Sequence, residues 1–328
     1  MNKVILAAWV GIGMLVCAAA SGQKFVLTTV YPYNADSGDE FIARRFAEEA
    51  AKRSNGQLTI KYLGGVEVVP SNNQLEAVMN GVVDMSFTLP GALEAKARPF
   101  RVSHTSPYTY AQERSMGIHA HWQKFFKDNF NLYFLGTGNK NHKWSFVAKK
   151  KYSSLADLKG AKWAGSGTML LPAYKKLGIA GINVLLQDLY SALSEGVVEG
   201  QITTLSYQKD LKLWEVTKYF GDEPFYGGSG MMHVVNMKKW NSLPPNLQEL
   251  MNQVQKDLEP QVEKFMAEDD EAARQLFIKN GALPIRWNAA DARTWKDLWN
   301  NEVWSAVKES MPTDQYAPLQ SVYKYPYK

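Results

Sequence analysis

Residues Gln74–Leu89 read QLEAVMNGVVDMSFTL, and residues Leu189–Thr204 read LYSALSEGVVEGQITT. Each stretch passes from an apolar helical face through a glycine into a short run of β-forming residues. This order predicts a helix, a glycine in the left-handed conformation that ends it, and a strand. Aligned without a gap, the two stretches share Ala77/Ala192, Gly81/Gly196, Val82/Val197, Val83/Val198 and Thr88/Thr203, with Asp84 opposite Glu199.

Two copies of one helix–glycine–strand unit predict two similar α/β lobes. Ligands of open α/β sheets lie beyond the carboxyl ends of the strands. Two lobes that face each other across those ends form a cleft, and hinged closure of a cleft suits the capture of a small molecule. The alternative is a chance similarity between two amphipathic helices.

Residues 1–22 have the pattern of a Sec signal peptide. Lys3 precedes an apolar run, Val4–Val16, and small residues follow with a cleavage site at Ala18-x-Ala20. The chain is therefore expected in the bacterial periplasm. Cys17, the only cysteine, leaves lipidation open as an alternative, although Val16 fits poorly before a lipidated cysteine. A mature chain without cysteine has no disulfide.

The charge of the chain argues against a nucleic-acid partner. Without Lys3 the chain has 36 Lys and Arg residues against 32 Asp and Glu residues. The only basic triplet is Lys149–Lys151, whereas nucleic-acid binding requires a stripe of basic residues. No segment after the leader has the length and hydropathy of a membrane span.

The order of predicted elements favours a parallel sheet in the first half of the chain. A strand at Phe25–Tyr31, a helix at 39–53 and a strand at Gln57–Leu63 come before the first repeated unit, which gives the order β-α-β-α-β. Residues 311–328 show no clear period and are expected to lie over a surface. Further strands are predicted at Leu132–Thr137, Lys143–Ala148, Ile182–Leu186, Met231–Met237 and Ala282–Trp287, and further helices at Leu170–Leu177, Asn246–Asn280 and Asp291–Ser310.

The residues of common catalytic and metal sites are missing. His119 and His121 are two positions apart, so a helix would place them on different faces, where they cannot chelate one metal ion. No G-x-S-x-G elbow is present, and the glycine clusters lack the spacing of a nucleotide-binding loop. We therefore predict no cofactor, no metal and no enzymatic activity, with an enzyme on the same scaffold as the alternative.

Aromatic, hydroxyl and amide side chains follow several of the predicted strands. Aromatic rings can form the apolar wall of a solute site, while hydroxyls and amides orient the solute. Each aromatic residue alone fits a core or surface role better than a ligand contact, and only the grouping of several at strand ends favours a pocket. The predicted ligand-binding residues are Tyr31, Tyr33, Asn34, Phe87, Thr88, Trp144, Trp163, Ser166, Thr168, Thr203, Thr204, Tyr207 and Tyr226.

Four stretches give the chain its family resemblance. SSLADLKGAKW at 153–163, LQDLYSALSEGVVEGQ at 186–201 and VVNMKKWNSLPPNLQELM at 234–251, with QLEAVMNGVVDMSF at 74–87, resemble the DctP-type periplasmic solute-binding proteins of TRAP transporters. The resemblance implies two α/β lobes linked by crossing strands and a long helix that spans both. It also implies closure on a small organic solute and delivery to the membrane permease subunits.

By this resemblance the chain divides into two discontinuous lobes. Lobe I comprises residues 24–141 and 230–269, and lobe II comprises residues 142–229 and 270–328. The protein is expected to act as a monomer. A ligand-sensing partner of a membrane sensor kinase or chemoreceptor is the alternative function, and the sequence does not separate the two.

The chain departs from the family pattern at two positions that matter for binding. The family's carboxylate-binding arginine, in the strand after DLKG, corresponds to Ala164, and the asparagine of G-Q-E-N-P corresponds to Thr203. Lysine or alanine cannot replace the bidentate fork of arginine. Three explanations stay open: a neutral or zwitterionic solute; an anion held elsewhere, for instance by Lys140, Lys143 or amides near Ser166–Thr168; or loss of transport.

Overall fold

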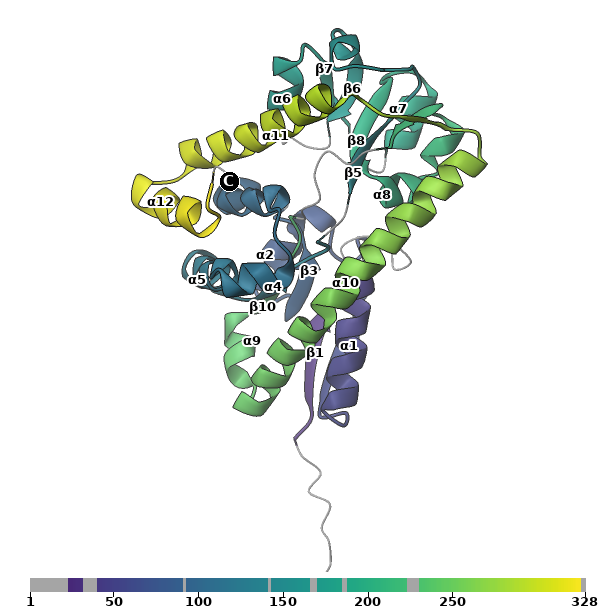
Figure 1. The fold of residues 1–328 in the computed structure, drawn as a ribbon. Helices are drawn as coiled ribbons and strands as arrows, with labels where there is room; N and C mark the ends of the chain where they lie inside the picture. The colour runs from purple at the N-terminus through teal and green to yellow at the C-terminus, as the bar shows by residue number, and fades with distance from the viewer. Residues whose placement is uncertain are drawn as a thin grey trace, which may run out of the picture.

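The computed structural model describes residues 23–31, 40–90, 93–140, 143–165, 170–184, 188–222 and 230–325. The chain forms two α/β lobes, and the long helix α10 (Pro245–Lys279) extends along both (Figure 1). The predicted limits of the long helix, 246–280, agree with the observed ones to within one residue at each end.

Lobe I contains two small sheets. In the first, β1 (Phe25–Thr29) and β2 (Leu58–Tyr62) are parallel and joined by α1 (Phe41–Arg53). The second has the order β3-β10-β4, with strands β3 (Met85–Thr88), β10 (Met232–Asn236) and β4 (Leu132–Thr137). The central strand β10 is antiparallel to both of its neighbours.

The parallel sheet that the order of elements predicts for the first half of the chain is only partly correct. Among the strands of lobe I that the structure describes, only β1 and β2 pair in parallel, because β3 takes an antiparallel partner, β10, from a distant part of the chain. One backbone bond, from the Asp84 amide to the Thr28 carbonyl at 2.9 Å, still joins β3 to β1. The local β-α-β order gives no sign that β3 pairs with β10, a strand far along the chain.

Lobe II contains one mixed sheet with the order β11-β9-β5-β8-β6-β7. Strand β8 (Gly200–Thr204) is antiparallel to β5 (Trp144–Ala148) and parallel to β6 (Lys162–Gly165). Strands β4 and β5, which are consecutive in the chain, belong to different sheets, so the chain crosses between the lobes after Thr137. The other strands are β7 (Ala180–Asn183), β9 (Tyr219–Gly221) and β11 (Leu283–Ile285).

Both repeated stretches form the predicted helix–glycine–strand unit. In lobe I, α2 (Gln74–Met79) ends before Gly81 and leads to β3; in lobe II, α7 (Leu189–Ser194) ends before Gly196 and leads to β8. The φ angles of the two glycines are +73° and +76°. This is the left-handed region, where a Cβ atom is unfavourable, so glycine is favoured at both positions.

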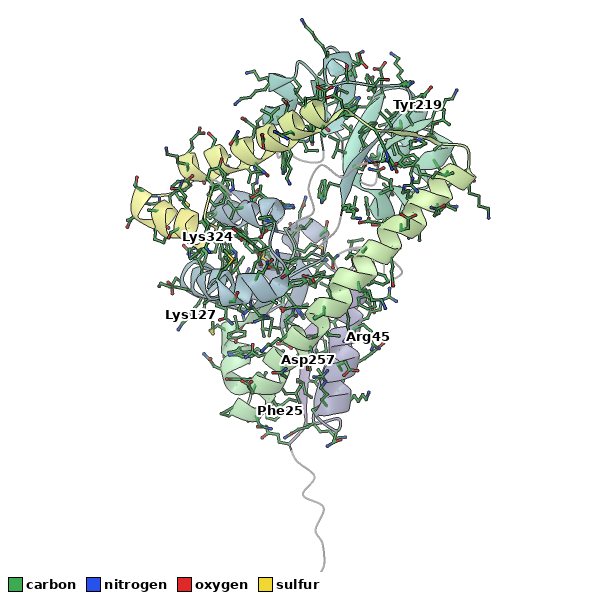
Figure 2. All side chains as sticks on the ribbon, in the orientation of Figure 1. Phe25, Arg45, Lys127, Tyr219, Asp257 and Lys324 are labelled. Carbon is green, nitrogen blue, oxygen red and sulfur yellow. The ribbon has the colours of Figure 1, made fainter. Side chains whose placement is uncertain are left out.

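Helix α10 is attached to both lobes by polar contacts. In lobe I, Glu259 pairs with Arg114, with 2.8 Å between Oε2 and the arginine Nε. In lobe II, Asp269 accepts a bond of 2.6 Å from Lys209 Nζ, and Asp270 accepts one of 2.8 Å from the Lys143 amide. Figure 2 shows Asp257 of α10 beside α1, where it pairs with Arg53.

The remaining helices cover the sheets. No helix in the described part of the chain has the length and hydropathy to span a membrane. The described α-helices not yet named are α3 (Glu94–Ala97), α4 (Tyr110–Ser115), α5 (Ile118–Phe130), α6 (Leu171–Lys176), α8 (Leu205–Asp210), α9 (Met237–Ser242), α11 (Ala289–Ser310) and α12 (Thr313–Val322), and the longest 3₁₀ segment is η4 (Arg98–Thr105).

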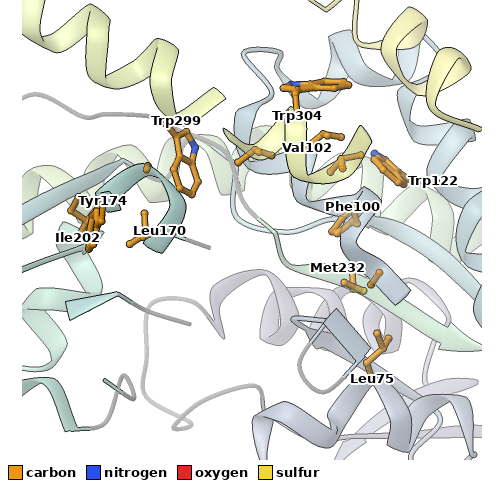
Figure 3. Close-up of a cluster of buried hydrophobic side chains, with 14 of the residues drawn as sticks. Leu75, Phe100, Val102, Trp122, Leu170, Tyr174, Ile202, Met232, Trp299 and Trp304 are labelled. Atoms are coloured by element: carbon orange, nitrogen blue, oxygen red, sulfur yellow. The ribbon is translucent and has the colours of Figure 1, made fainter. Parts of the chain in front are cut away.

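The largest hydrophobic core is continuous between the lobes through α11. Trp295 of this helix packs with Tyr174 of lobe II. Figure 3 shows Trp299 on the side of Leu170 in lobe II and Trp304 on the side of Phe100 and Trp122 in lobe I. Burial of such large aromatic side chains is a major source of folding free energy. Helix α11 therefore contributes to the cores of both lobes.

The C-terminal segment has more structure than its sequence indicates. Residues 313–322 form α12 although the helix contains Pro318, and the following Tyr323 is fully buried. The Tyr323 hydroxyl accepts a hydrogen bond of 2.9 Å from the Trp122 indole of α5. The segment that the sequence assigns to lobe II thus ends against lobe I, and aromatic packing replaces the missing helical period.

Candidate functional site

At the carboxyl ends of β1 and β2, two tyrosines stack. The ring centroids of Tyr31 and Tyr62 are 4.0 Å apart, and their planes differ by 13°. Tyr62 also packs against a cluster of buried residues that includes Phe87. The stack therefore joins Tyr31, a predicted site residue, to the packed strand ends of lobe I. Sequence reasoning missed Tyr62, which has the same place in β2 as Thr29 in β1.

A cation lies over this pair. The Arg44 guanidinium carbon, in the first turn of α1, is 5.7 Å from the centroid of the Tyr31 ring. In the described part of the chain Arg44 forms no ion pair, while its neighbour Arg45 pairs with Glu48 at 2.7 Å. Burial, and to a lesser degree the charge of Glu40, raise the pKa of Tyr62, so its hydroxyl is neutral.

Phe87 and Thr88 end strand β3, and both are buried. The Phe87 ring meets the His233 ring edge to face, with 5.9 Å between the centroids. The Thr88 hydroxyl donates to the carbonyl of Leu89 at 3.3 Å. Both side chains thus lie at the end of a strand, as expected, but they are buried in the packed interior of lobe I.

In lobe II, the start of β5 and the end of β8 bring four predicted residues together. Trp144 pairs with Thr204, and Ser145 pairs with Thr203. The Thr204 hydroxyl caps helix α8 by accepting a bond of 3.3 Å from the Tyr207 amide. Because Thr204 is an N-cap residue, its hydroxyl has a structural role that its position at a strand end did not indicate.

Trp163 does not join this group. Its ring is fully buried and packs against Phe146, Tyr152 and Tyr174, with centroids between 5.4 and 6.2 Å away. A Cβ atom on Gly200 would come within 2.7 Å of the Trp163 indole nitrogen, so the ring depends on that glycine. Strand alternation turns Trp163 and Ala164 to opposite faces of the sheet, and Trp163 faces the core beside α11.

The opposite face of β6 and β8 has a polar side chain in apolar surroundings. Gln201 pairs with Ala164 on one side and with Val147 on the other. Ala164 and Val147 belong to a buried apolar cluster that includes Leu189 and Leu193 of α7. Gln201 is fully buried, and neither its amide nitrogen nor its amide oxygen has a hydrogen-bond partner in the described part of the chain. Sequence reasoning passed over this residue.

Lys140, a candidate cation for an anionic solute, is already paired. Its ammonium lies 2.5 Å from Glu113 Oε1 and 3.3 Å from the Tyr108 carbonyl, and both charged side chains are almost fully buried. The Ser106 hydroxyl donates to the same Glu113 oxygen at 2.5 Å. Lys143, the other candidate, is exposed, and its backbone amide donates to Asp270.

Five predicted site residues fall outside the described residues: Tyr33, Asn34, Ser166, Thr168 and Tyr226. No group of His, Cys, Asp or Glu side chains that could hold a metal ion occurs in the parts that the structure describes. The candidate site therefore comprises two strand-end groups. In lobe I it has Tyr31 with Tyr62 and Arg44. In lobe II it has Trp144 and Thr203, which lie at one edge of the sheet but on opposite faces of it.

A fold of two α/β lobes with one long helix along both is the architecture of bacterial extracellular binding proteins. The model of the DctP family, "bacterial extracellular solute-binding protein, family 7", matches residues 35–310. The chain belongs to this family, whose members are solute-binding proteins and not enzymes. The resemblance that the sequence motifs indicate is confirmed.

Two solved structures share the fold over nearly all of their length. A TRAP periplasmic solute-binding protein of Desulfovibrio salexigens with bound orotic acid has a TM-score of 0.80 and 20% identity; the alignment covers 92% of this chain and 98% of the other. An extracytoplasmic solute receptor of Bordetella pertussis that binds pyroglutamic acid has a TM-score of 0.77 and 17% identity, with 92% and 99% covered.

Sequence comparison finds a related protein in Nostoc. The monocarboxylate 2-oxoacid-binding periplasmic protein of Nostoc sp. is 26% identical over 250 residues, which are 71% of this chain and 65% of the relative. The chain thus spans slightly under two thirds of the length of that relative. These similarities establish the two-lobed α/β fold.

Proposed function

We propose that this protein is an extracytoplasmic solute receptor that binds a small organic acid and delivers it to the permease of a TRAP-type secondary transporter. The family match over residues 35–310 carries the proposal. The three similar proteins described above are named for a 2-oxoacid, orotic acid and pyroglutamic acid, all of them carboxylic acids. This supports an acid over a neutral solute.

The proposed mechanism is closure of two lobes around the solute. Lobe I would comprise residues 24–141 and 230–269, and lobe II residues 142–229 and 270–328, with the cleft at the strand ends. Closure expels water and strengthens polar contacts inside the site. The solute favours the closed form only through contacts that it makes in that form and not in the open one. Export by the leader at 1–22 would place the receptor in the periplasm.

Arg44 is the cation that we propose for the solute's carboxylate. The family's arginine position in lobe II is Ala164, and the Lys140 ammonium is bound to Glu113. Arg44 lies beside Tyr31 at the strand ends of lobe I without an ion-pair partner in the described residues. A guanidinium can form two parallel hydrogen bonds to one carboxylate, and the Tyr31 ring supports its plane.

The first experiment is a thermal-shift screen of the leaderless protein after denaturation and refolding remove any co-purified solute. The panel contains carboxylates, sulfonates, amines, polyols and neutral aromatic compounds. A ligand at a hundred times its Kd adds about 2.7 kcal/mol to the free energy of unfolding, which a thermal shift detects. Stabilisation by carboxylates, with the acid recovered unchanged, supports the receptor. Stabilisation by amines or polyols alone would contradict the proposal that the solute is an organic acid.

Two adjacent arginines test the position of the charge. Arg44→Gln should weaken binding of the acid roughly 10- to 100-fold, the loss of one or two charge-assisted hydrogen bonds. Arg45→Gln is the matched control, because its guanidinium is committed to the surface pair with Glu48. Equal affinities of the two variants, measured by calorimetry, would place the carboxylate elsewhere while leaving the receptor function intact.

A further inference from the structure

Gln201 is buried in the sheet of lobe II in a way that the fold does not require. Its side chain is 0% exposed, and its two amide atoms lack hydrogen-bond partners in the described structure. Buried polar groups are nearly always paired, since the loss of their hydrogen bonds to water opposes folding. A leucine of similar volume would fit the apolar surroundings without that loss.

Another buried glutamine shows that the fold can satisfy such an amide. Gln74 of lobe I is also 0% exposed, and its Nε2 donates to the carbonyls of Tyr31 at 2.8 Å and Val69 at 3.2 Å. Its Oε1 accepts from the Ser86 hydroxyl at 3.5 Å. When the repeated units are aligned, Ser86 corresponds to Gln201. The same position is thus paired in lobe I and unpaired in lobe II.

Gln201 lies next to the position that corresponds to the family's arginine. Its register partner is Ala164, the position of the family's arginine, and β6 ends one residue later at Gly165. In a strand, Thr203 lies on the same face as Gln201, two residues closer to the carboxyl end.

We propose that Gln201 is a specificity residue, whose amide pairs with a neutral group of the solute that carries both a donor and an acceptor, such as a lactam or an imide. The proposal rests on the proposed function, in which Arg44 of lobe I binds the carboxylate. Lobe II then recognises the neutral part of the same solute. The Gln201 oxygen accepts from the lactam N–H, and its nitrogen donates to the lactam carbonyl.

The test compares Gln201→Leu with the wild-type protein and with Gln208→Leu. Gln208 is the control, because its Nε2 already donates to the carbonyls of Ser145 at 2.9 Å and Thr203 at 3.0 Å. The probes are pyroglutamate, which has a lactam, and cyclopentanecarboxylate, an acid with a five-membered ring and no amide. The readouts are the Tm of the refolded, solute-free protein and the Kd from calorimetry.

Gln201→Leu should raise the Tm by about 3 °C and weaken pyroglutamate binding about tenfold, with the affinity for cyclopentanecarboxylate unchanged. Gln208→Leu should lower the Tm. A lower Tm for Gln201→Leu, or a higher Tm with unchanged pyroglutamate affinity, would overturn the proposal. If the wild-type protein binds neither acid, the receptor proposal fails for these probes, and the sign of the Tm change still decides whether the amide is unpaired.

Discussion

The helix–glycine–strand units of the two lobes have the same backbone and different polar interiors. In lobe I, Gln74 begins α2 and closes a network with Ser86 of β3 and with two backbone carbonyls. In lobe II the aligned unit begins with Leu189, an apolar residue, and the polar position in the strand is the unpaired Gln201.

The acidic residues at the start of the strands differ in the same way. In lobe I, Asp84 accepts hydrogen bonds from the amide and hydroxyl of Thr28 at 2.7 and 3.0 Å. In lobe II, Glu199 pairs with Lys150 at the surface and accepts from Tyr152 at 3.0 Å. The same local fold therefore pairs the polar side chains of this unit in lobe I, while in lobe II it leaves a buried amide without a partner in the described structure.

The largest effect should come from the buried charge pair of lobe I. Lys140→Met leaves the buried Glu113 carboxylate without its cation, which should lower the free energy of unfolding by roughly 3–5 kcal/mol. Lys150→Met in lobe II is the control, because its pair with Glu199 is solvent-exposed and should cost less than about 1 kcal/mol. Urea denaturation measures both. Similar losses of unfolding free energy in the two variants would mean that the buried pair of lobe I and the exposed pair of lobe II do not differ in strength.

The two buried glutamines should respond to leucine in opposite directions. Gln74→Leu leaves two backbone carbonyls and the Ser86 hydroxyl without a partner, so it should destabilise the protein by about 3 kcal/mol. Gln201→Leu removes no bond and should stabilise it. If both substitutions destabilise the protein in urea denaturation, Gln201 has a partner in solution and the comparison between the lobes fails.

Acid should destabilise lobe I more than lobe II. Burial lowers the pKa of His233 from 6.5 to about 4, against the smaller opposing effect of its 2.9 Å contact with Gln255, and burial lowers the pKa of His104 and His119 to about 3. All three belong to lobe I. Because the folded state holds them neutral, their stabilisation is complete above pH 6.5 and is lost as the pH falls towards 4.

For His233 alone the loss between pH 7 and pH 5 is about 2 kcal/mol. His233→Asn keeps a donor for Gln255 and removes the titration, so this variant should show a correspondingly smaller loss over the same interval. Unfolding free energies measured at both pH values give the difference. An unchanged pH dependence in the variant would mean that His233 does not titrate in this range.

The smallest effect should come from the glycine that ends the helix of each repeated unit. Gly81→Ala and Gly196→Ala each place a Cβ atom on a backbone with positive φ, which should cost about 1 kcal/mol in either lobe. Space is no obstacle, because the new carbon would meet only Asn236 at 3.9 Å in the first case and no atom within 4 Å in the second. A cost confined to one lobe, again in urea denaturation, would contradict the equivalence of the units.

Much of the local structure could be predicted from the sequence because it depends on neighbouring residues. The glycines at 81 and 196, the presence of a strand after each of them, and the limits of α10 and α11 to within two residues all follow from local patterns. Pairing between distant segments could not be predicted in this way. Strand β10 inserts between β3 and β4, and Tyr323 returns to Trp122, and neither contact has a signal in the adjoining sequence.

The sequence predicts where in the fold the candidate site lies better than it predicts which side chains form it. Tyr31, Trp144 and Thr203 lie at strand ends as expected, because those ends follow from the strand limits. The aromatic character of Trp163 suggested a pocket wall, yet its face of the sheet is covered by α11, a helix more than a hundred residues later. In the described structure Arg44 has no ion-pair partner and the Gln201 amide has no hydrogen-bond partner. A sequence alone does not show either fact.

The aromatic core around α11 gives the protein an internal optical reporter. Trp295 lies 6.0 Å from Trp287 and packs in lobe II, whereas the indole of Trp304 donates to Thr105 of lobe I at 3.2 Å. Any rotation of one lobe against the other must change the surroundings of at least one of these rings. Intrinsic fluorescence of the unlabelled protein should therefore follow lobe closure in real time, and stopped-flow mixing with a solute would give its rate.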